Sequence, residues 1–422
     1  MSGFRSPLDA YREDLSRMPG RQRLAADDEF WIILATGLRR LAQAANRSRP
    51  AAAHRLGQAL VTLAQELSSP RRDGNDQEIE ATTDRPMEVA DALAHYPDPE
   101  HASPLVSRIR TVAADAEEAG AIGLAREILT DLVDISPHAP PLERGLVLLQ
   151  LGRIARTLGD LDGAQDLLKS AGELGRTNGN RELEAREALG LGVIARTRGN
   201  YPAARAYFER GLAGALQVGL VDVQGMCHHG LMIVCAEADD FDSAMQHAWQ
   251  LVSAARSNAS REAEALTNLA QLCAKAGYDA AALGAFTAAL ARTAAPRLRL
   301  PILAGIAASA GRLRNAPRVA DAEQAIGVEA NDAFPFETSG AWLAVARARR
   351  ALGDVPSGDA AAEKAAVIAH AHKFYEITHR LEQEVVRPQI PLADVNLEFV
   401  RSLETWSDDP SANLTFSSAP TG

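Results

Sequence analysis

One pattern recurs seven times along this chain of 422 residues, at intervals of about 40 residues. Each copy has a small residue, a Gly or Asp seven positions later, an Ala or Gly five positions after that, and then an apolar residue four positions further on. Two copies are nearly alike, LGRIARTLGDLDGAQDLLKSA (Leu151–Ala171) and LGVIARTRGNYPAARAYFERG (Leu191–Gly211). Such self-similarity predicts a stack of similar structural units rather than a globular domain around one core.

Each position of the pattern has a physical reason. Gly can take the left-handed conformation that ends a helix and reverses the chain, and Asp tolerates the same turn. The predicted turn positions are Gly120, Gly159, Gly199, Asp239, Gly277, Gly311 and Gly353, at intervals of 39, 40, 40, 38, 34 and 42 residues. Small residues that let two helices approach closely are predicted before the turn at Ala113, Gly152, Gly192, Ala270, Ala304 and Ala346, and after it at Ala125, Ala164, Ala204, Ala244, Ala282 and Ala316. Large apolar side chains are predicted to fill the space between the units at Leu129, Leu168, Phe208 and Phe286. The sequence therefore predicts two antiparallel helices in each copy.

Composition supports an all-α fold and narrows the classes of partner. Aromatic residues make up 5% of the chain against a hydrophobic total of 46%, and alanine is abundant, which suits closely packed helices better than a sheet. The net charge of −11 does not favour nucleic acid as a partner. The longest apolar run, Phe30–Leu38, is too short to span a membrane, and three cysteines favour a reducing compartment. We therefore expect a cytoplasmic protein without a membrane partner.

The repeat resembles the tetratricopeptide repeat (TPR). Trp342, Val345 and Ala346 follow the W-x2-L-G pattern of that family, and Pro137 stands where its second helix ends. The period near 40 is similar to that of the long repeats in kinesin light chains, the bacterial maltose-regulon activator and bacterial peptide-pheromone receptors. The resemblance covers residues 105–386 and implies a right-handed superhelical solenoid of about seven helix pairs.

The rest of the chain has a different composition. Residues 1–69 contain two helical patterns that favour an N-terminal helical pair, and residues 70–104 are polar and rich in proline, as expected of a linker. Residues 387–422 form a C-terminal segment that ends in a Ser/Pro/Thr-rich, largely disordered tail, with disorder expected beyond Trp406.

Motifs that could carry chemistry have packing explanations. Gly190-Leu-Gly192-Val-Ile-Ala195 matches a dinucleotide fingerprint, but its glycines are expected inside a repeat helix. Cys227-His228-His229 and Cys235 could suggest a metal, but neighbouring helical positions point to different sides. We therefore expect no catalytic residue, no metal site and no cofactor.

The inner face of the predicted solenoid offers candidate binding residues. In TPR proteins certain positions of the first helix line this groove, and the resemblance places Arg153, Arg156, Arg186, Arg196, His229, Asn268, Gln271 and Lys275 there. Arg156 and Arg196 occupy one position of adjacent repeats, about 10 Å apart at ordinary helix spacing, and guanidinium groups suit a carboxylate or an acidic segment. Peptide-binding TPR proteins use an Asn at the position of Asn268 to hold a peptide's backbone amide. The alternative for the arginines is that they only solvate the surface and pair with nearby carboxylates.

These features predict a non-enzymatic scaffold whose partly basic groove binds a protein or peptide segment, acidic or with a free carboxylate. The alternative is a peptide-responsive regulator of transcription or signalling, similar to the pheromone receptors. An enzyme would need a catalytic domain that the flanking segments are too short to supply. The sequence does not give the partner, the pathway or the oligomeric state.

Overall fold

The structure is a computed structural model that describes residues 106–407, except 108, 112, 115–116, 118–121, 136–138, 257, 331–333 and 382–389. The expected N-terminal pair, the linker, Gly120, Pro137 and the end of the C-terminal segment lie outside the described residues.

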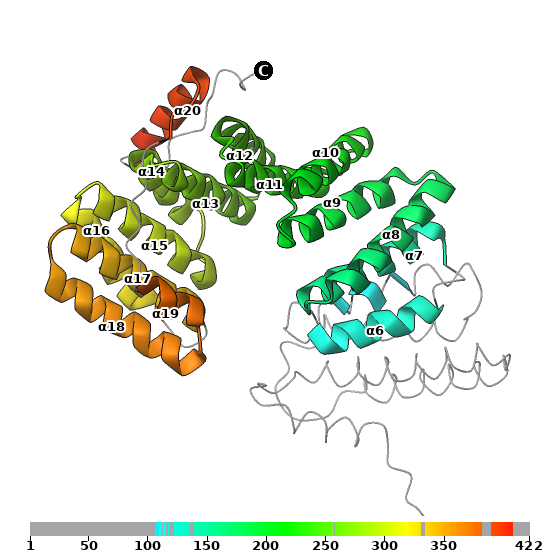
Figure 1. Ribbon diagram of the computed structural model, residues 1–422, viewed down its shortest axis with the longest axis horizontal. Coiled ribbons are helices and arrows are strands. Elements are labelled where there is room, and N and C mark those ends of the chain that lie inside the picture. The colour runs from blue at the N-terminus through cyan, green and yellow to red at the C-terminus, as the bar shows by residue number, and fades with distance from the viewer. Residues whose placement is uncertain are drawn as a thin grey trace, which may run out of the picture. The chain divides into compact units, whose positions relative to one another are not determined.

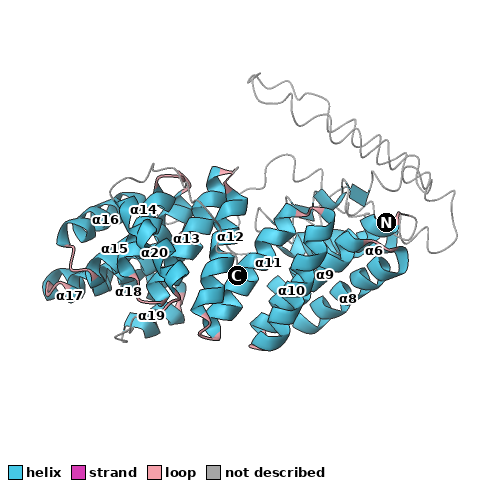
Figure 2. Ribbon diagram, turned by 90° about the horizontal axis from the view of Figure 1, so that it is seen from above, coloured by secondary structure: helices cyan, strands magenta, loops and turns pink. Residues whose placement is uncertain are grey.

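The described residues are helical throughout and contain no strand (Figure 2). The helices are α6 (Ile122–Ile135), α7 (Pro141–Thr157), α8 (Leu161–Asn178), α9 (Arg181–Thr197), α10 (Tyr201–Val218), α11 (Val221–Glu237), α12 (Phe241–Ala255), α13 (Ala259–Lys275), α14 (Asp279–Leu290), α15 (Pro296–Arg312), α16 (Ala316–Glu329), α17 (Pro335–Ala351), α18 (Val355–His372), α19 (Tyr375–Leu381) and α20 (Asp394–Glu404). The short 3-10 helix η2 (Thr405–Ser407) follows α20. No helix in this part of the chain is long and apolar enough to cross a membrane.

Successive helices pack on one another within each of two compact units. The helices form two compact units: one ends at Ile194 and includes Ala213–Val218, and the other comprises Ala195–Leu212 and the chain from Gly219 onward. In the first unit α6 packs on α7 and α7 on α8. In the second unit, each helix from α11 to α15 packs on the helix that follows it. Helix α17 packs more on α15 than on α16. The first helices of successive pairs also touch, α13 with α15 and α15 with α17 (Figure 1). This is the packing of a TPR-type α-solenoid, as the sequence predicts.

The predicted turns are confirmed at five positions. Gly159, Gly199, Gly277 and Gly353 have φ angles of 72° to 87°, and Asp239 has a φ of 58°. The following residue often caps the second helix: Asp160 Oδ1, for example, accepts a hydrogen bond from the backbone N–H of Gly163 at 2.9 Å. The small residues beside these turns are buried, and Leu129, Leu168, Phe208 and Phe286 are all at most 4% exposed.

The predicted turn at Gly311 is wrong. Gly311 lies inside α15, and the left-handed residue is Arg314, with a φ of 55°. A Cβ at Gly311 would lie 2.6 Å from the Cα of Ala348 on α17, so this glycine permits close approach of two helices. The neighbouring predicted positions shift by the same three residues: Ala307 and Val319 are fully buried, whereas Ala304 is half-buried and Ala316 is exposed. With Arg314 as the turn, the last two intervals become 37 and 39 residues.

The C-terminal helix α20 returns to the middle of the second unit and packs on α12 and α14 (Figure 1). Asn396 is 1% exposed, and its Nδ2 donates to Oδ1 of Asp242 at 2.7 Å. The backbone N–H of Ala393 donates to the same carboxylate oxygen at 2.9 Å, and the rings of Phe399 and Trp249 meet edge to face at 5.2 Å. The repeat pattern does not predict this helix.

Candidate binding site

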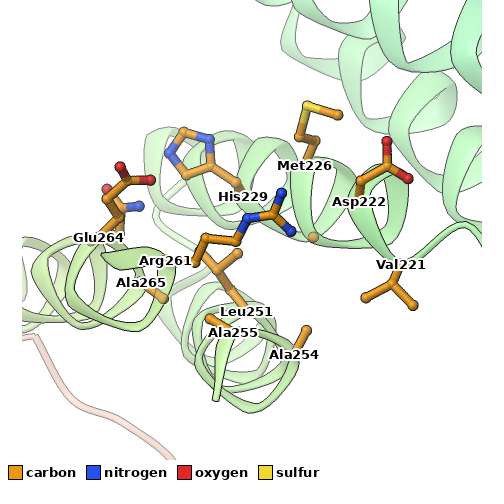
Figure 3. Close-up of a pocket in the computed structure, with 12 residues that line it drawn as sticks. Val221, Asp222, Met226, His229, Leu251, Ala254, Ala255, Arg261, Glu264 and Ala265 are labelled. Carbon is orange, nitrogen blue, oxygen red and sulfur yellow. The ribbon is translucent and has the colours of Figure 1, made fainter. Parts of the chain in front are cut away.

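A pocket of about 320 Å³ lies in the second unit where α11, α12 and α13 meet (Figure 3). Its apolar wall includes Val221, Met226 and Leu251. Val221 and Met226 are 56% and 47% exposed, so two large apolar side chains face solvent at its edge. Apolar side chains in this setting favour contact with a ligand or partner.

Helical spacing brings the polar groups of the pocket together. Arg261, Glu264 and Asn268 are three and four residues apart on α13 and therefore share one face. The side chain of Asn258 fixes the start of this helix by accepting a hydrogen bond from the backbone N–H of Arg261 at 3.1 Å. The opposite wall repeats the spacing on α11, where Asp222, Met226 and His229 line the pocket.

Asn268 is the polar group best placed to hold a ligand. It is half-buried and has no hydrogen-bond partner among the described residues. Its amide can donate and accept hydrogen bonds at once, which matches a peptide group. Because the amide lines the pocket, a ligand there can reach both its donor and its acceptor.

The charges of the pocket are mixed rather than basic. It holds one guanidinium, that of Arg261, and the two carboxylates of Asp222 and Glu264. Within the described residues Arg261 and Glu264 form no ion pair, and Figure 3 shows the Arg261 side chain extending over Leu251 into the pocket. Such a pocket can meet a ligand that carries charges of both signs.

His229 contributes a neutral imidazole to the pocket. Burial lowers the pKa of His229 below its usual value, and the positive charge of Arg196 lowers it further. The ring is therefore uncharged at neutral pH and can donate one hydrogen bond and accept another.

The next residue, His228, faces a different neighbour. Its Nδ1 lies 3.1 Å from Nδ1 of His247 on α12, and the ring centroids are 5.3 Å apart. Burial, with a smaller contribution from His247, lowers the pKa of His228 to about 4. Burial also lowers the pKa of His247, and Arg205 lowers it further.

The eight residues predicted for the groove have different surroundings. His229 and Asn268 line the pocket, and Arg196 is close enough to influence His229. Three cations form ion pairs instead: Arg153 with Glu117 at 2.7 Å, Arg186 with Glu182 at 2.9 Å, and Lys275 with Glu237 at 2.8 Å. These pairs fit the alternative in which charged groups only solvate the surface. Gln271 is exposed on α13.

The predicted spacing between Arg156 and Arg196 stays a prediction. Arg156 is half-buried in the last turn of α7 in the first unit, whereas Arg196 belongs to the second unit.

Arg261, Glu264 and Met226 line the pocket but are not among the residues that the resemblance predicts for the groove. The spacing of Arg261 and Glu264 relative to Asn268 was the signal that could have found two of them.

The other motifs have structural roles. Gly190 and Gly192 lie within α9, and a Cβ at Gly190 would meet Leu168 at 2.8 Å, so the glycines serve helix packing. The three cysteines are buried thiols, and burial raises the pKa of Cys227 and of Cys273 to about 12. The described residues contain no group of three or more His, Cys, Asp or Glu side chains placed to hold a metal ion.

Comparison with known proteins supports the fold. No family model and no curated protein matches the chain. Among solved structures, a signal transduction ATPase with numerous domains (STAND) that has a tetratricopeptide repeat sensor, from Pyrococcus horikoshii, is similar with a TM-score of 0.56 and 13% sequence identity. The match covers 89% of this chain and 56% of that protein, so this chain spans little more than half the length of that relative.

Two further structures are more distant. A Rap protein complexed with competence and sporulation factor has a TM-score of 0.48 and 9% identity, over 84% of this chain and 99% of that one. Aspartyl phosphate phosphatase F from Bacillus subtilis has a TM-score of 0.39 and 9% identity, over 91% of each chain. At these identities the comparisons bear on fold alone. Together with the helix packing, the likeness to the STAND protein shows that this chain has the TPR fold.

Proposed function

We propose that this protein is a non-enzymatic TPR scaffold that binds a peptide or an extended protein segment in the pocket between α11 and α13. One observation carries the proposal: the half-buried amide of Asn268 lines the same pocket as the exposed apolar side chains of Val221 and Met226. The amide would hold a backbone group of the segment, and the apolar wall would take one of its side chains.

The charges of the pocket refine the expected ligand. The sequence favours an acidic segment or a free carboxylate, for which Arg261 is the nearest guanidinium. Because Asp222 and Glu264 lie in the same pocket, a segment with a carboxylate and a nearby cation would fit better than a purely acidic one. The proposal includes no chemical step.

Selection from a phage-displayed library of random peptides on the full chain tests this function. The affinity of selected peptides is then measured by fluorescence anisotropy. Asn268→Ala should weaken binding about 5- to 100-fold, as expected when one buried hydrogen-bonding group loses its partner. Met226→Glu should weaken it as well, since a carboxylate replaces part of the apolar wall.

Arg210→Glu is the control, because Arg210 is an exposed residue on α10 and does not line the pocket. Peptides that bind all of these variants equally would place the ligand elsewhere. A selection that enriches no peptide over the bare support would contradict peptide binding itself.

The regulator predicted as the alternative would use the same pocket. The P. horikoshii relative is described as having a TPR sensor, and a sensor role for this chain would require that a bound peptide change its structure or its partners. Hydrogen exchange with and without a selected peptide distinguishes the two: a scaffold gains protection only around α11 to α13, whereas a sensor also changes in distant helices.

A further inference from the structure

The side chains of His228 and His247 meet through one ring nitrogen each. The two Nδ1 atoms face each other across 3.1 Å, from adjacent helices of one pair. The ring planes are tilted by 39°, and both side chains are half-buried. With both rings neutral, one Nδ1 carries a hydrogen and the other accepts it.

The same geometry is close to that of two imidazoles on one metal ion. Two Zn–N bonds of about 2.05 Å at a tetrahedral angle place the nitrogens about 3.3 Å apart, and with the metal in both ring planes the ring centroids lie about 5.2 Å apart. The observed distances are 3.1 Å and 5.3 Å. An ion could therefore replace the shared hydrogen with movements of a few tenths of an ångström.

We propose that His228 and His247 bind a divalent transition-metal ion through their two Nδ1 atoms, with water in the remaining positions. Imidazole nitrogen is a favoured ligand of Zn²⁺, Ni²⁺ and Cu²⁺, whereas Mg²⁺ and Ca²⁺ prefer oxygen. A pair of nitrogen ligands therefore selects Zn²⁺, Ni²⁺ or Cu²⁺ over Mg²⁺ and Ca²⁺. The sequence analysis discounted a metal at Cys227-His228-His229 because it considered neighbours on one helix, whereas the partner of His228 is on α12.

The protons balance without an added base. The ring that carries hydrogen on Nδ1 shifts it to Nε2 through solvent, which leaves both Nδ1 lone pairs for the metal. Both rings are already neutral, so binding releases no proton at neutral pH. Near His247 the positive charge of Arg205 is offset by Glu209 and Asp240, which lie 3.0 Å and 3.7 Å from its guanidinium nitrogens.

The ion would join two walls of the pocket. His228 is on α11 and His247 on α12, and both helices contribute pocket residues. Because the metal binds the folded pair and has no such site in the unfolded chain, it would stabilise the folded state. This consequence does not depend on peptide binding.

Titration of the tag-free full chain, treated with chelator and exchanged into metal-free buffer, tests the site. Zn²⁺ is titrated at pH 7.5 by calorimetry, and Co²⁺ is added to record the visible absorption that reports nitrogen ligands. The variants are His228→Gln and His247→Gln, with helix content checked by circular dichroism. His370→Gln is the matched control, since His370 is an exposed histidine on α18.

We expect one ion per chain and a higher midpoint of thermal unfolding with Zn²⁺ than with chelator. Loss of an outer-shell partner alone costs about 10- to 100-fold in metal affinity, so loss of either ligand should cost at least as much. His370→Gln should bind as the wild type does. Wild-type affinity in both His228→Gln and His247→Gln, or a Co²⁺ spectrum that persists in both, would show that the pair is a hydrogen bond and nothing more. The absence of stoichiometric binding by the wild type would overturn the proposal as well.

Discussion

At the scale of single residues, Gly311 is the sharpest test of the packing. A Cβ at this position would lie 2.6 Å from the Cα of Ala348, so the backbones of α15 and α17 would have to separate. We expect Gly311→Ala to lower the free energy of unfolding by about 1–3 kcal/mol, as other overpacked positions do. Urea unfolding followed by circular dichroism measures the effect.

Gly327→Ala is its control. Gly327 is also helical, but the nearest side-chain atom to its added Cβ is in Trp342, 4.0 Å away. There the better helix propensity of alanine should raise stability by up to about 1 kcal/mol. Equal effects at both positions would show that α15 and α17 are not in the close contact described.

The repeat pattern predicted most of the turns because a Gly or Asp in the left-handed conformation follows most of the first helices. It failed at Gly311 because glycine also occurs where two helices pack closely. The glycine alone does not distinguish a turn from a close helix contact. The capping residue would have resolved this. Asp or Asn follows most turns, as at Asp160 and Asp240, and Asn315 caps α16 by accepting a hydrogen bond from the N–H of Arg318. A pattern that included this cap would have selected Arg314.

At the scale of elements, one buried amide contributes to the docking of α20. Asn396 donates to the carboxylate of Asp242 and to its backbone oxygen. Asn396→Ala leaves these acceptors with fewer donors and should loosen α20 from α12 by about 1–3 kcal/mol. Limited proteolysis of the full chain should then cleave faster within α20, whereas Glu398→Ala, at an exposed position of the same helix, should not change the rate. Unchanged cleavage of Asn396→Ala would mean that this hydrogen bond does not hold the helix.

The sequence could not indicate where α20 packs, for a physical reason. This helix does not follow the repeat, and its partner Asp242 is 154 residues away in the chain, so no local spacing links the two. The candidate pocket shows the same limit. The TPR resemblance led to His229 and Asn268, but Arg261 and Met226 belong to the pocket through the meeting of α11, α12 and α13, which local periodicity does not describe.

The contact between α11 and α12 should be sensitive to acid. The pKa of His228 falls from 6.5 to about 4 in the folded chain, so folding favours the neutral ring. The stabilisation is complete above pH 6.5 and is lost as the pH falls towards 4, because burial disfavours the charged ring and the unfolded chain takes up the proton first. Because the ring is partly exposed, we expect a loss of roughly 2 kcal/mol over this range.

Unfolding at pH 7.5, 6, 5 and 4.5 in the presence of chelator measures this dependence. Other groups also titrate in this range, so the quantity that matters is the difference between the wild type and His228→Gln. The stability of the variant should fall less between pH 7.5 and 4.5. A parallel decline in both would show that the neutral pair contributes nothing.

At the scale of the whole molecule, a repeat architecture limits how far a local defect spreads. Apart from α20, the helices of the described residues contact mainly their neighbours along the chain, so stability is close to a sum of local terms. Gly311→Ala should therefore reduce amide protection in α15 to α18 and leave α7 and α8 unchanged, since those two helices belong to the other compact unit. Hydrogen exchange followed by mass spectrometry resolves the two regions in one experiment, with Gly327→Ala as the reference. Equal loss of protection in every described helix would show that the chain unfolds as one cooperative body, and mutations near the pocket would then report global stability rather than local binding.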